Sequence, residues 1–258
     1  MTVLASSGRV WLRNWLVYRR LWHRSLAFGF LQPVLFLAAM GLGIGALIGT
    51  DTEAFGGFEY IDWLGPGLLA AMAMQTATFE STYPIMNKIM WGRNYEAMLS
   101  TPLGTRHLVL GELFWVAFRI GSLATVFLVV LFIFGIPRTP TAVLAIPVAM
   151  LIGVAFSSNL FAFTTTQKND VGFSAIFRFV INPLFLFSGT FFPLSQLPDQ
   201  IEWIAWLTPL FHGVELIRGL ILGTLNWAAA PIHLAYLLAM LTIGTILADR
   251  LLRRRMAG

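Results

Sequence analysis

The feature that most constrains the fold is a run of 25 residues without a charged side chain, Ser25 to Gly49. A hydrocarbon core about 30 Å thick is crossed by roughly 20 helical residues, so this run is long enough to span a membrane. Only a helix or a closed barrel pairs all backbone groups in lipid. The whole chain is 57% hydrophobic and 11% charged, whereas soluble domains are about a quarter charged. The sequence therefore predicts an all-α, polytopic membrane protein.

The same length criterion predicts five further membrane spans after the first. They are Asp62–Met86, His107–Gly135, Ala142–Thr166, Val171–Phe192 and Trp227–Arg250. No stretch between them is long enough for a separate soluble domain. We therefore expect a single membrane domain over residues 1–258, with a six-helix core over 25–250.

The positions of lysine and arginine predict the orientation, because cytoplasmic loops are enriched in these residues. The segment before the first span, the loops after the second and fourth spans, and the C-terminus are all basic. The loop Thr50–Ile61 carries only acids, and the loop Ile136–Thr141 has one base, Arg138. Both termini are therefore expected in the cytoplasm. The net charge of +5 suits the anionic inner leaflet.

The basic segment Arg9–Arg24 has two faces when it is read as a helix. Aromatic residues fall on one side within roughly 60°, and arginines fall on the other. The aromatic residues are Trp11, Trp15, Tyr18 and Trp22, and the arginines are Arg9, Arg13, Arg20 and Arg24. This pattern predicts an interfacial helix over residues 7–24 rather than a nucleic-acid arm or a cleaved signal. The aromatic stripe faces either acyl chains or the neighbouring spans.

Several kinds of chemistry are absent from the sequence. There is no cysteine, no H-E-x-x-H and no G-x-S-x-G, and the four histidines are far apart. A P-loop needs Gly-Lys-Ser/Thr, but the two lysines, Lys88 and Lys168, follow Asn87 and Gln167. We therefore expect no catalytic residues, metal or cofactor in this chain.

The cytoplasmic loop Asn87–His107 predicts a short helix over Arg93–Ser100, stopped by Thr101-Pro102. One alternative is a plain polar connector. The other is a docking helix, because Tyr95, Met98 and Leu99 are apolar side chains in the cytoplasm that favour a partner groove.

The segment Phe187–Gly223 is apolar, but Pro193, Pro198 and Pro209 divide it into pieces too short to span. Such pieces are typical of interfacial or re-entrant helices. We expect a re-entrant segment over 193–223, with short helices over Pro198–Leu207 and Leu210–Leu222. Trp203 and Trp206 would lie at the outer headgroup level, and Glu215 and Arg218 would form a surface pair.

Polar residues within the spans form a second candidate site, because a charge in lipid usually faces protein or water. Two interpretations remain open: a network that ties helices together, or groups that line a cargo path. These residues are Glu80, Glu112, Arg119, Arg178 and Asn182. A row of small residues in the first span, Gly41, Gly45 and Gly49, predicts a helix-packing face within or between subunits.

The order of these parts resembles the ABC-2 type permeases, the membrane halves of bacterial ABC exporters. The most similar pieces are Arg93-Asn94-Tyr95-Glu96 through Thr101-Pro102-Leu103, and FSGTFFPLSQLP followed by LTPLFHGVELIRGLILG. Within the family they resemble most the permeases of nodulation lipooligosaccharide exporters, and next the daunorubicin-type drug-resistance permeases.

The resemblance implies a type V, ABCG-like fold with three functional parts. The connecting helix would include Arg13, Trp15, Arg20 and Trp22. The coupling helix would place Arg93, Tyr95, Glu96, Met98 and Leu99 on an ATPase subunit. The outer gate would include Trp203, Trp206, Glu215 and Arg218.

The function implied is a permease subunit of an ATP-driven exporter for an amphiphile such as a lipid, a glycolipid or a hydrophobic drug. It would lie in the bacterial inner membrane among lipids, with an ATP-binding subunit that holds ATP and Mg and a second permease half, identical or homologous. No nucleic-acid partner is expected. The alternative is an ion-coupled secondary transporter or a channel subunit, which would favour an inverted repeat and acids at the midplane.

Overall fold

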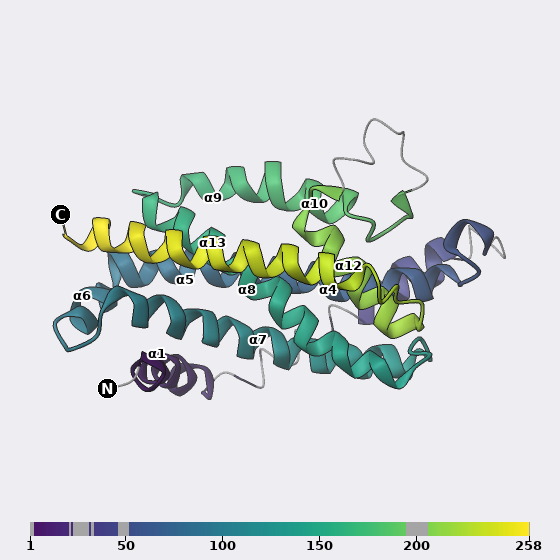
Figure 1. Ribbon diagram of the computed structural model, residues 1–258, viewed down its shortest axis with the longest axis horizontal. Coiled ribbons are helices and arrows are strands. Elements are labelled where there is room, and N and C mark those ends of the chain that lie inside the picture. The colour runs from purple at the N-terminus through teal and green to yellow at the C-terminus, as the bar shows by residue number, and fades with distance from the viewer. Residues whose placement is uncertain are drawn as a thin grey trace.

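The computed structural model describes residues 3–20, 22, 31, 34–45, 52–194 and 206–257. Within these ranges every regular element is a helix, so the all-α class is confirmed for the described part of the chain. The long helices α4, α7, α8 and α13 run along the long axis of the molecule, with α1 beside the first half of α7 (Figure 1).

Three of the described segments are long and apolar enough to cross a membrane. They are α7 (Thr105–Ile133), the pair η4 (Pro140–Leu144) and α8 (Ala145–Thr166), and α13 (Ala230–Ala257). The helix α4 (Tyr60–Ser81) has 22 residues, but it carries Asp62, Gln75 and Glu80. In the expected first span the longest described element is η1 (Leu37–Ile44). The count of six spans therefore stays a prediction.

Two of the expected spans are divided into shorter elements. Pro84 cannot donate a backbone hydrogen bond, and α4 ends just before it, at Ser81. The chain continues as α5 (Tyr83–Met86) and the π-helix η3 (Asn87–Trp91). The expected fifth span consists of α9 (Val171–Ile176), η5 (Phe177–Ile181) and α10 (Asn182–Phe187). It ends before Phe192 because Gly189 adopts a left-handed conformation (φ 76°) and turns the chain.

The shorter elements lie at the two ends of the molecule. The helix α6 (Asn94–Leu99) falls within the expected range Arg93–Ser100 and precedes Thr101-Pro102. At the other end are η2 (Glu53–Phe55) and α12 (Pro209–Leu222). The hydroxyl of Thr208 caps α12 by accepting from the backbone N–H of Phe211 at 3.4 Å. The predicted helix Pro198–Leu207 lies largely outside the described residues.

The N-terminal helix α1 (Val3–Tyr18) packs its aromatic side chains on α7. The rings of Trp11 and Trp15 lie 5.6 and 5.3 Å from the ring of Phe118, both edge-on. Of the two alternatives for the stripe, the neighbouring span is confirmed for these residues. The helix α1 ends at Tyr18 and a turn follows at residues 19–20. The expected end near Arg24 lies outside the described residues, so it stays a prediction.

The expected packing row of glycines is confirmed at one position. A Cβ on Gly41 would lie 2.7 Å from the side chain of Ile61, so α4 approaches η1 closely there. Among the described residues, a Cβ on Gly45 would meet nothing within 4 Å. Gly49 lies outside the described residues.

Close approach of α1 to α7 depends on Gly111. A Cβ there would lie 2.5 Å from the Cβ of Val10 and 2.8 Å from the backbone oxygen of Ser7, so the helices would have to separate. We expect Gly111→Ala to lower the free energy of unfolding by about 1–3 kcal/mol through overpacking. The midpoint of thermal unfolding of the detergent-solubilised chain measures this effect.

The matched control is Gly8→Ala, because a Cβ on Gly8 of α1 meets nothing within 4 Å. That variant should keep or slightly raise the midpoint, since alanine favours a helix. Equal losses for both variants would contradict the role of Gly111.

Candidate functional site

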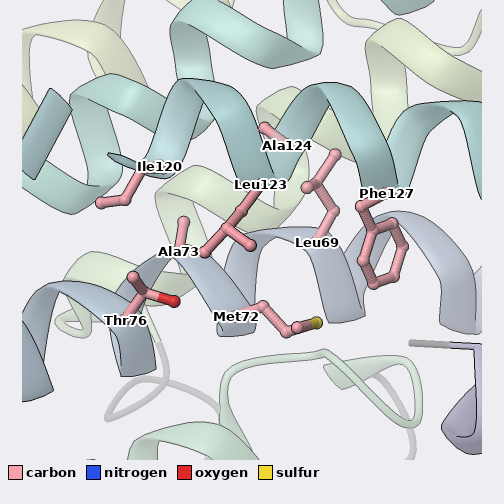
Figure 2. Close-up of a pocket in the computed structure, with 8 residues that line it drawn as sticks. All are labelled: Leu69, Met72, Ala73, Thr76, Ile120, Leu123, Ala124 and Phe127. Atoms are coloured by element: carbon pink, nitrogen blue, oxygen red, sulfur yellow. The ribbon is translucent and has the colours of Figure 1, made fainter. Parts of the chain in front are cut away.

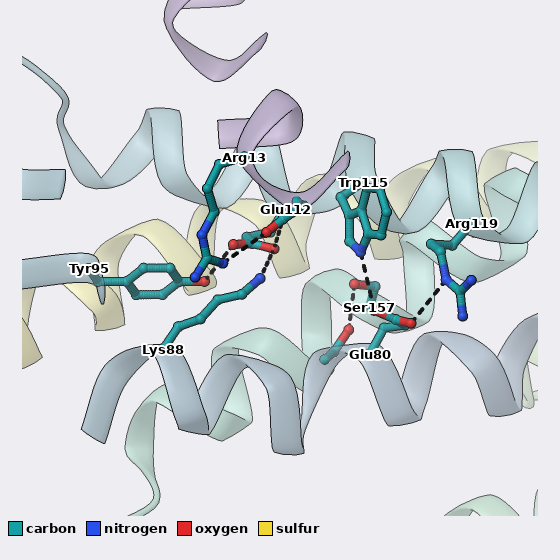
Figure 3. A network of polar contacts seen from close by, with 10 residues as sticks. Arg13, Glu80, Lys88, Tyr95, Glu112, Trp115, Arg119 and Ser157 are labelled. Atoms are coloured by element: carbon teal, nitrogen blue, oxygen red, sulfur yellow. Dashed lines mark hydrogen bonds and ion pairs between the residues drawn. The ribbon is translucent and has the colours of Figure 1, made fainter. Parts of the chain in front are cut away.

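The carboxylate of Glu112 on α7 joins three other segments of the chain. It accepts hydrogen bonds from Lys88 Nζ at 2.6 Å, from Asn14 Nδ2 at 2.9 Å and from the Tyr95 hydroxyl at 3.2 Å. These partners belong to η3, α1 and α6, and Figure 3 shows the side chains of Lys88 and Tyr95 both pointing toward Glu112 from the same side. One buried acid therefore connects α1, η3 and α6 to α7.

This cluster is sealed from solvent. The side chains of Lys88 and Glu112 are 10% and 4% exposed, and Tyr95 is fully buried. A buried charge requires a partner and several hydrogen bonds, and Glu112 has both. Burial raises the pKa of Tyr95 well above its usual value, and the nearby Glu112 carboxylate raises that pKa further, so the hydroxyl remains a donor.

A second polar cluster lies about two turns further along α7. The Arg119 guanidinium pairs with Glu80 of α4 (Nε to Oε1, 3.2 Å), and Trp115 Nε1 donates to the other Glu80 oxygen at 3.3 Å (Figure 3). The same guanidinium lies 4.6 Å from the ring centre of Tyr18 on α1. Glu80, Glu112 and Arg119 thus lie in polar contacts that tie helices together, as one interpretation of the sequence predicts.

A pocket of about 310 Å³ lies between the two clusters, with α1 on one side and α4, η3 and α7 on the others. Arg13, Lys88 and Arg119 line it together with Glu80. Arg13 donates to Asn14 Oδ1 at 3.1 Å, and Asn14 in turn donates to Glu112. Three of the lining side chains are cationic and one is acidic. The binding of a cargo headgroup in this pocket stays a prediction.

Tyr95 anchors the helix α6, because its side chain is buried inside the molecule. The expectation that Tyr95 faces a partner is therefore wrong: its hydroxyl finds an acceptor only in the core, and its ring lies 6.4 Å from that of Phe161. Arg93 precedes the helix with a positive φ of 45°, a strained conformation for an arginine. The side chains of Arg93 and Glu96 are 74% and 53% exposed, and Met98 and Leu99 are half-buried.

Arg178 and Asn182 do not join the polar contacts with Glu80 and Glu112. Both are exposed on η5 and α10, beside exposed apolar residues such as Phe179 and Phe187. The prediction that Arg178 and Asn182 join the polar network is wrong, because both side chains are on the exposed surface of η5 and α10.

The predicted connecting-helix residues divide between two environments. Trp15 is half-buried against α7, and Arg13 is half-buried at the polar pocket rather than on the open face. Arg20 is exposed in the turn that follows α1. Trp22 lies beyond the helix and is 50% exposed.

At the end of the molecule opposite α6, Arg218 is buried. The prediction that Glu215 and Arg218 pair on the surface is therefore wrong about where Arg218 lies. Its guanidinium lies 3.7 Å from the ring centre of Trp63 on α4 and donates to the Gly189 carbonyl at 2.7 Å. Glu215, 3.5 Å away, is partly exposed. Trp206 packs on Phe211 with ring centres 4.8 Å apart, and Trp203 lies outside the described residues.

A small hollow lies between α4 and α7 (Figure 2). Met72 and Phe127 lie on opposite sides of it, and its volume is about 10 Å³. This is at most the space of one water molecule, so the hollow is too small for an amphiphile.

Sequence reasoning missed Lys88 and Asn14 as members of the site. They lie 24 and 98 residues from Glu112, so no helical spacing connects them. The available signal was weak: Lys88 is one of two lysines in the chain and follows a proline-broken helix.

Comparisons with known proteins give one family model and several relatives. The family model for the ABC-2 type transporter matches residues 8–222. Nodulation protein J of Rhizobium leguminosarum bv. viciae is 31% identical over 247 residues, covering 96% of this chain and 93% of the relative. Nodulation protein J of Rhizobium meliloti (strain 1021) is 30% identical over 247 residues, covering 96% and 92%. The inner membrane transport permease YadH of Escherichia coli (strain K12) is 23% identical over 215 residues, covering 83% and 82%.

Removing the Glu112 charge should destabilise the junction. In Glu112→Gln the buried Lys88 loses its counter-ion, and breaking such a pair costs about 3–5 kcal/mol of unfolding free energy. Thermal unfolding in detergent measures the change. Adding Lys88→Met should cost less than the sum of the two single changes, because both remove the same interaction.

The control is Glu96→Gln, which removes a carboxylate 4.0 Å from an exposed arginine. Exposed pairs contribute little, so its unfolding midpoint should stay close to that of the unchanged chain. Additive effects at Lys88 and Glu112 would contradict the pairing.

Proposed function

Since this chain belongs to the ABC-2 type transporter family, we propose that it is the permease subunit of an ATP-driven exporter. In this proposal a separate ATP-binding subunit supplies ATP and Mg, and the chain lies in the bacterial inner membrane with both termini in the cytoplasm. The substrate is an amphiphile, a class that includes lipids, glycolipids, lipooligosaccharides and hydrophobic drugs. The relatives named Nodulation protein J support this function at family level.

The observation that carries the proposal is the attachment of α6. Tyr95 anchors this helix to Glu112, and the opposite face of the helix presents Arg93, Glu96 and Ala97 to solvent. A helix with one buried anchor and one free polar face suits a lever between an ATPase and the membrane core. We propose that closure of the ATPase subunits moves α6 as a rigid body together with α1 and α7.

The second permease half would pack along α9, η5 and α10. Val171, Phe179 and Phe187 are 72%, 73% and 45% exposed there, so this apolar surface is available to lipid or to another helix. Arg178 and Asn182 lie on the same surface. We propose that two such halves, identical or homologous, enclose the cargo path between them.

The test is charge reversal on α6. Glu96→Arg should weaken co-purification with the proposed ATP-binding subunit, and it should lower ATP hydrolysis and export by the reconstituted complex by about tenfold. The physical reason is like-charge repulsion at a protein interface, which costs binding energy and slows association. Insertion should be unchanged, because the side chain is exposed.

Asp170→Arg is the matched control, because Asp170 is also an exposed acid in a loop expected on the same side. It should leave co-purification and hydrolysis unchanged. Normal coupling in Glu96→Arg would refute the role of α6, and transport driven by protons or sodium without an ATPase would refute the whole proposal.

A further inference from the structure

An apolar groove of about 620 Å³ lies between α7, α8 and α13. This volume falls within the roughly 300–1,000 Å³ of small-molecule sites. Its walls are Leu110 and Phe114 on α7, Met150 and Val154 on α8, and Leu241 and Ile246 on α13. The groove is distinct from the polar junction, because α1 packs on a different face of α7, at Gly111 and Phe118.

The length of the groove matches one leaflet of a bilayer. On α7 its lining runs from Arg106 to Ala117, eleven residues apart. At 1.5 Å per residue this is about 16 Å, close to half of a hydrocarbon core about 30 Å thick. An acyl chain of one leaflet therefore fits along it.

One end of the groove is basic. Arg106 lines that end and is exposed, and Arg250 lies one helical turn beyond Ile246 on nearly the same face of α13. The nearby acid Asp249 is already engaged, since it accepts from Thr105 at 2.6 Å and from Arg253 at 2.8 Å. The bond between Thr105 and Asp249 joins α7 to α13 beside the basic end of the groove.

We propose that this groove binds an anionic phospholipid of the leaflet on the α6 side, which is the cytoplasmic leaflet in the predicted orientation. One acyl chain lies between α7 and α13 on the floor formed by α8. The phosphate lies at Arg106 and Arg250, where two guanidinium groups attract it. The site is a structural lipid site, and it stands whether or not the proposed export function is correct.

The test measures phosphatidylglycerol bound to the purified full-length chain. The chain is extracted from phosphatidylglycerol-containing membranes, washed in detergent, and analysed by native mass spectrometry. We expect about one retained phosphatidylglycerol per chain. Thr242→Trp fills the groove and should abolish retention, whereas Ile243→Trp, at a 57% exposed position next to it, should not.

Headgroup selectivity is tested with Arg106→Gln, an exposed change that should not disturb folding. Nanodiscs that contain equal phosphatidylglycerol and phosphatidylcholine supply both lipids. The preference for phosphatidylglycerol should fall about fivefold, as expected for one arginine near a lipid surface. Lys168→Gln removes an exposed charge from the loop between α8 and α9 and should leave the preference unchanged.

Three results would overturn the proposal. The first is equal retention in the two tryptophan variants. The second is an unchanged preference in Arg106→Gln. The third is loss of subunit association in Thr242→Trp with no loss of lipid, which would assign the groove to a protein partner.

Discussion

The need to neutralise one buried carboxylate organises the end of this protein that carries α6. Glu112 lies inside the helix bundle, where an unpaired charge would be far more costly than in water. Its partners come from α1, η3 and α6, so the carboxylate is satisfied only when all three segments are in place. The positions of α1 and α6 are therefore coupled through a single side chain.

The helix boundaries could be predicted from the sequence wherever local chemistry decides them. The length of the apolar segments predicted α7, α8 and α13, and the Thr101-Pro102 and Pro209 signals predicted α6 and α12 to within a few residues. Prolines also explain why α4 and the segment 171–187 are interrupted. These features depend on residues within one or two turns of each other, which a single sequence displays.

The orientations of polar side chains could not be predicted, because their partners are distant in the sequence. The sequence predicted that Tyr95 and Arg218 lie on the surface. In the structure the Tyr95 hydroxyl donates to Glu112 on α7, and the Arg218 guanidinium stacks on Trp63, 155 residues away in the chain. Arg138 seemed an exception to the orientation rule. It pairs with the buried Asp62 at 2.7 Å, and this hydrogen bond raises its pKa, so the base satisfies an acid rather than setting topology.

The helix α4 connects the two polar ends of the molecule. Near one end of α4, Glu80 pairs with Arg119. Near the other end, the ring of Trp63 contacts the guanidinium of Arg218. The two positions are 17 residues apart, which is about 25 Å of helix. The chain has a break at Thr82, which follows α4 and precedes Pro84. The turn at Gly189 belongs to another part of the chain, and Arg218 donates a hydrogen bond to its carbonyl. A packed helix transmits displacement as a rigid body, whereas such breaks absorb changes in backbone angles. The helix α4 therefore couples the contacts of Glu80 with those of Trp63, and the change in backbone direction at Thr82 lies just beyond the Glu80 end.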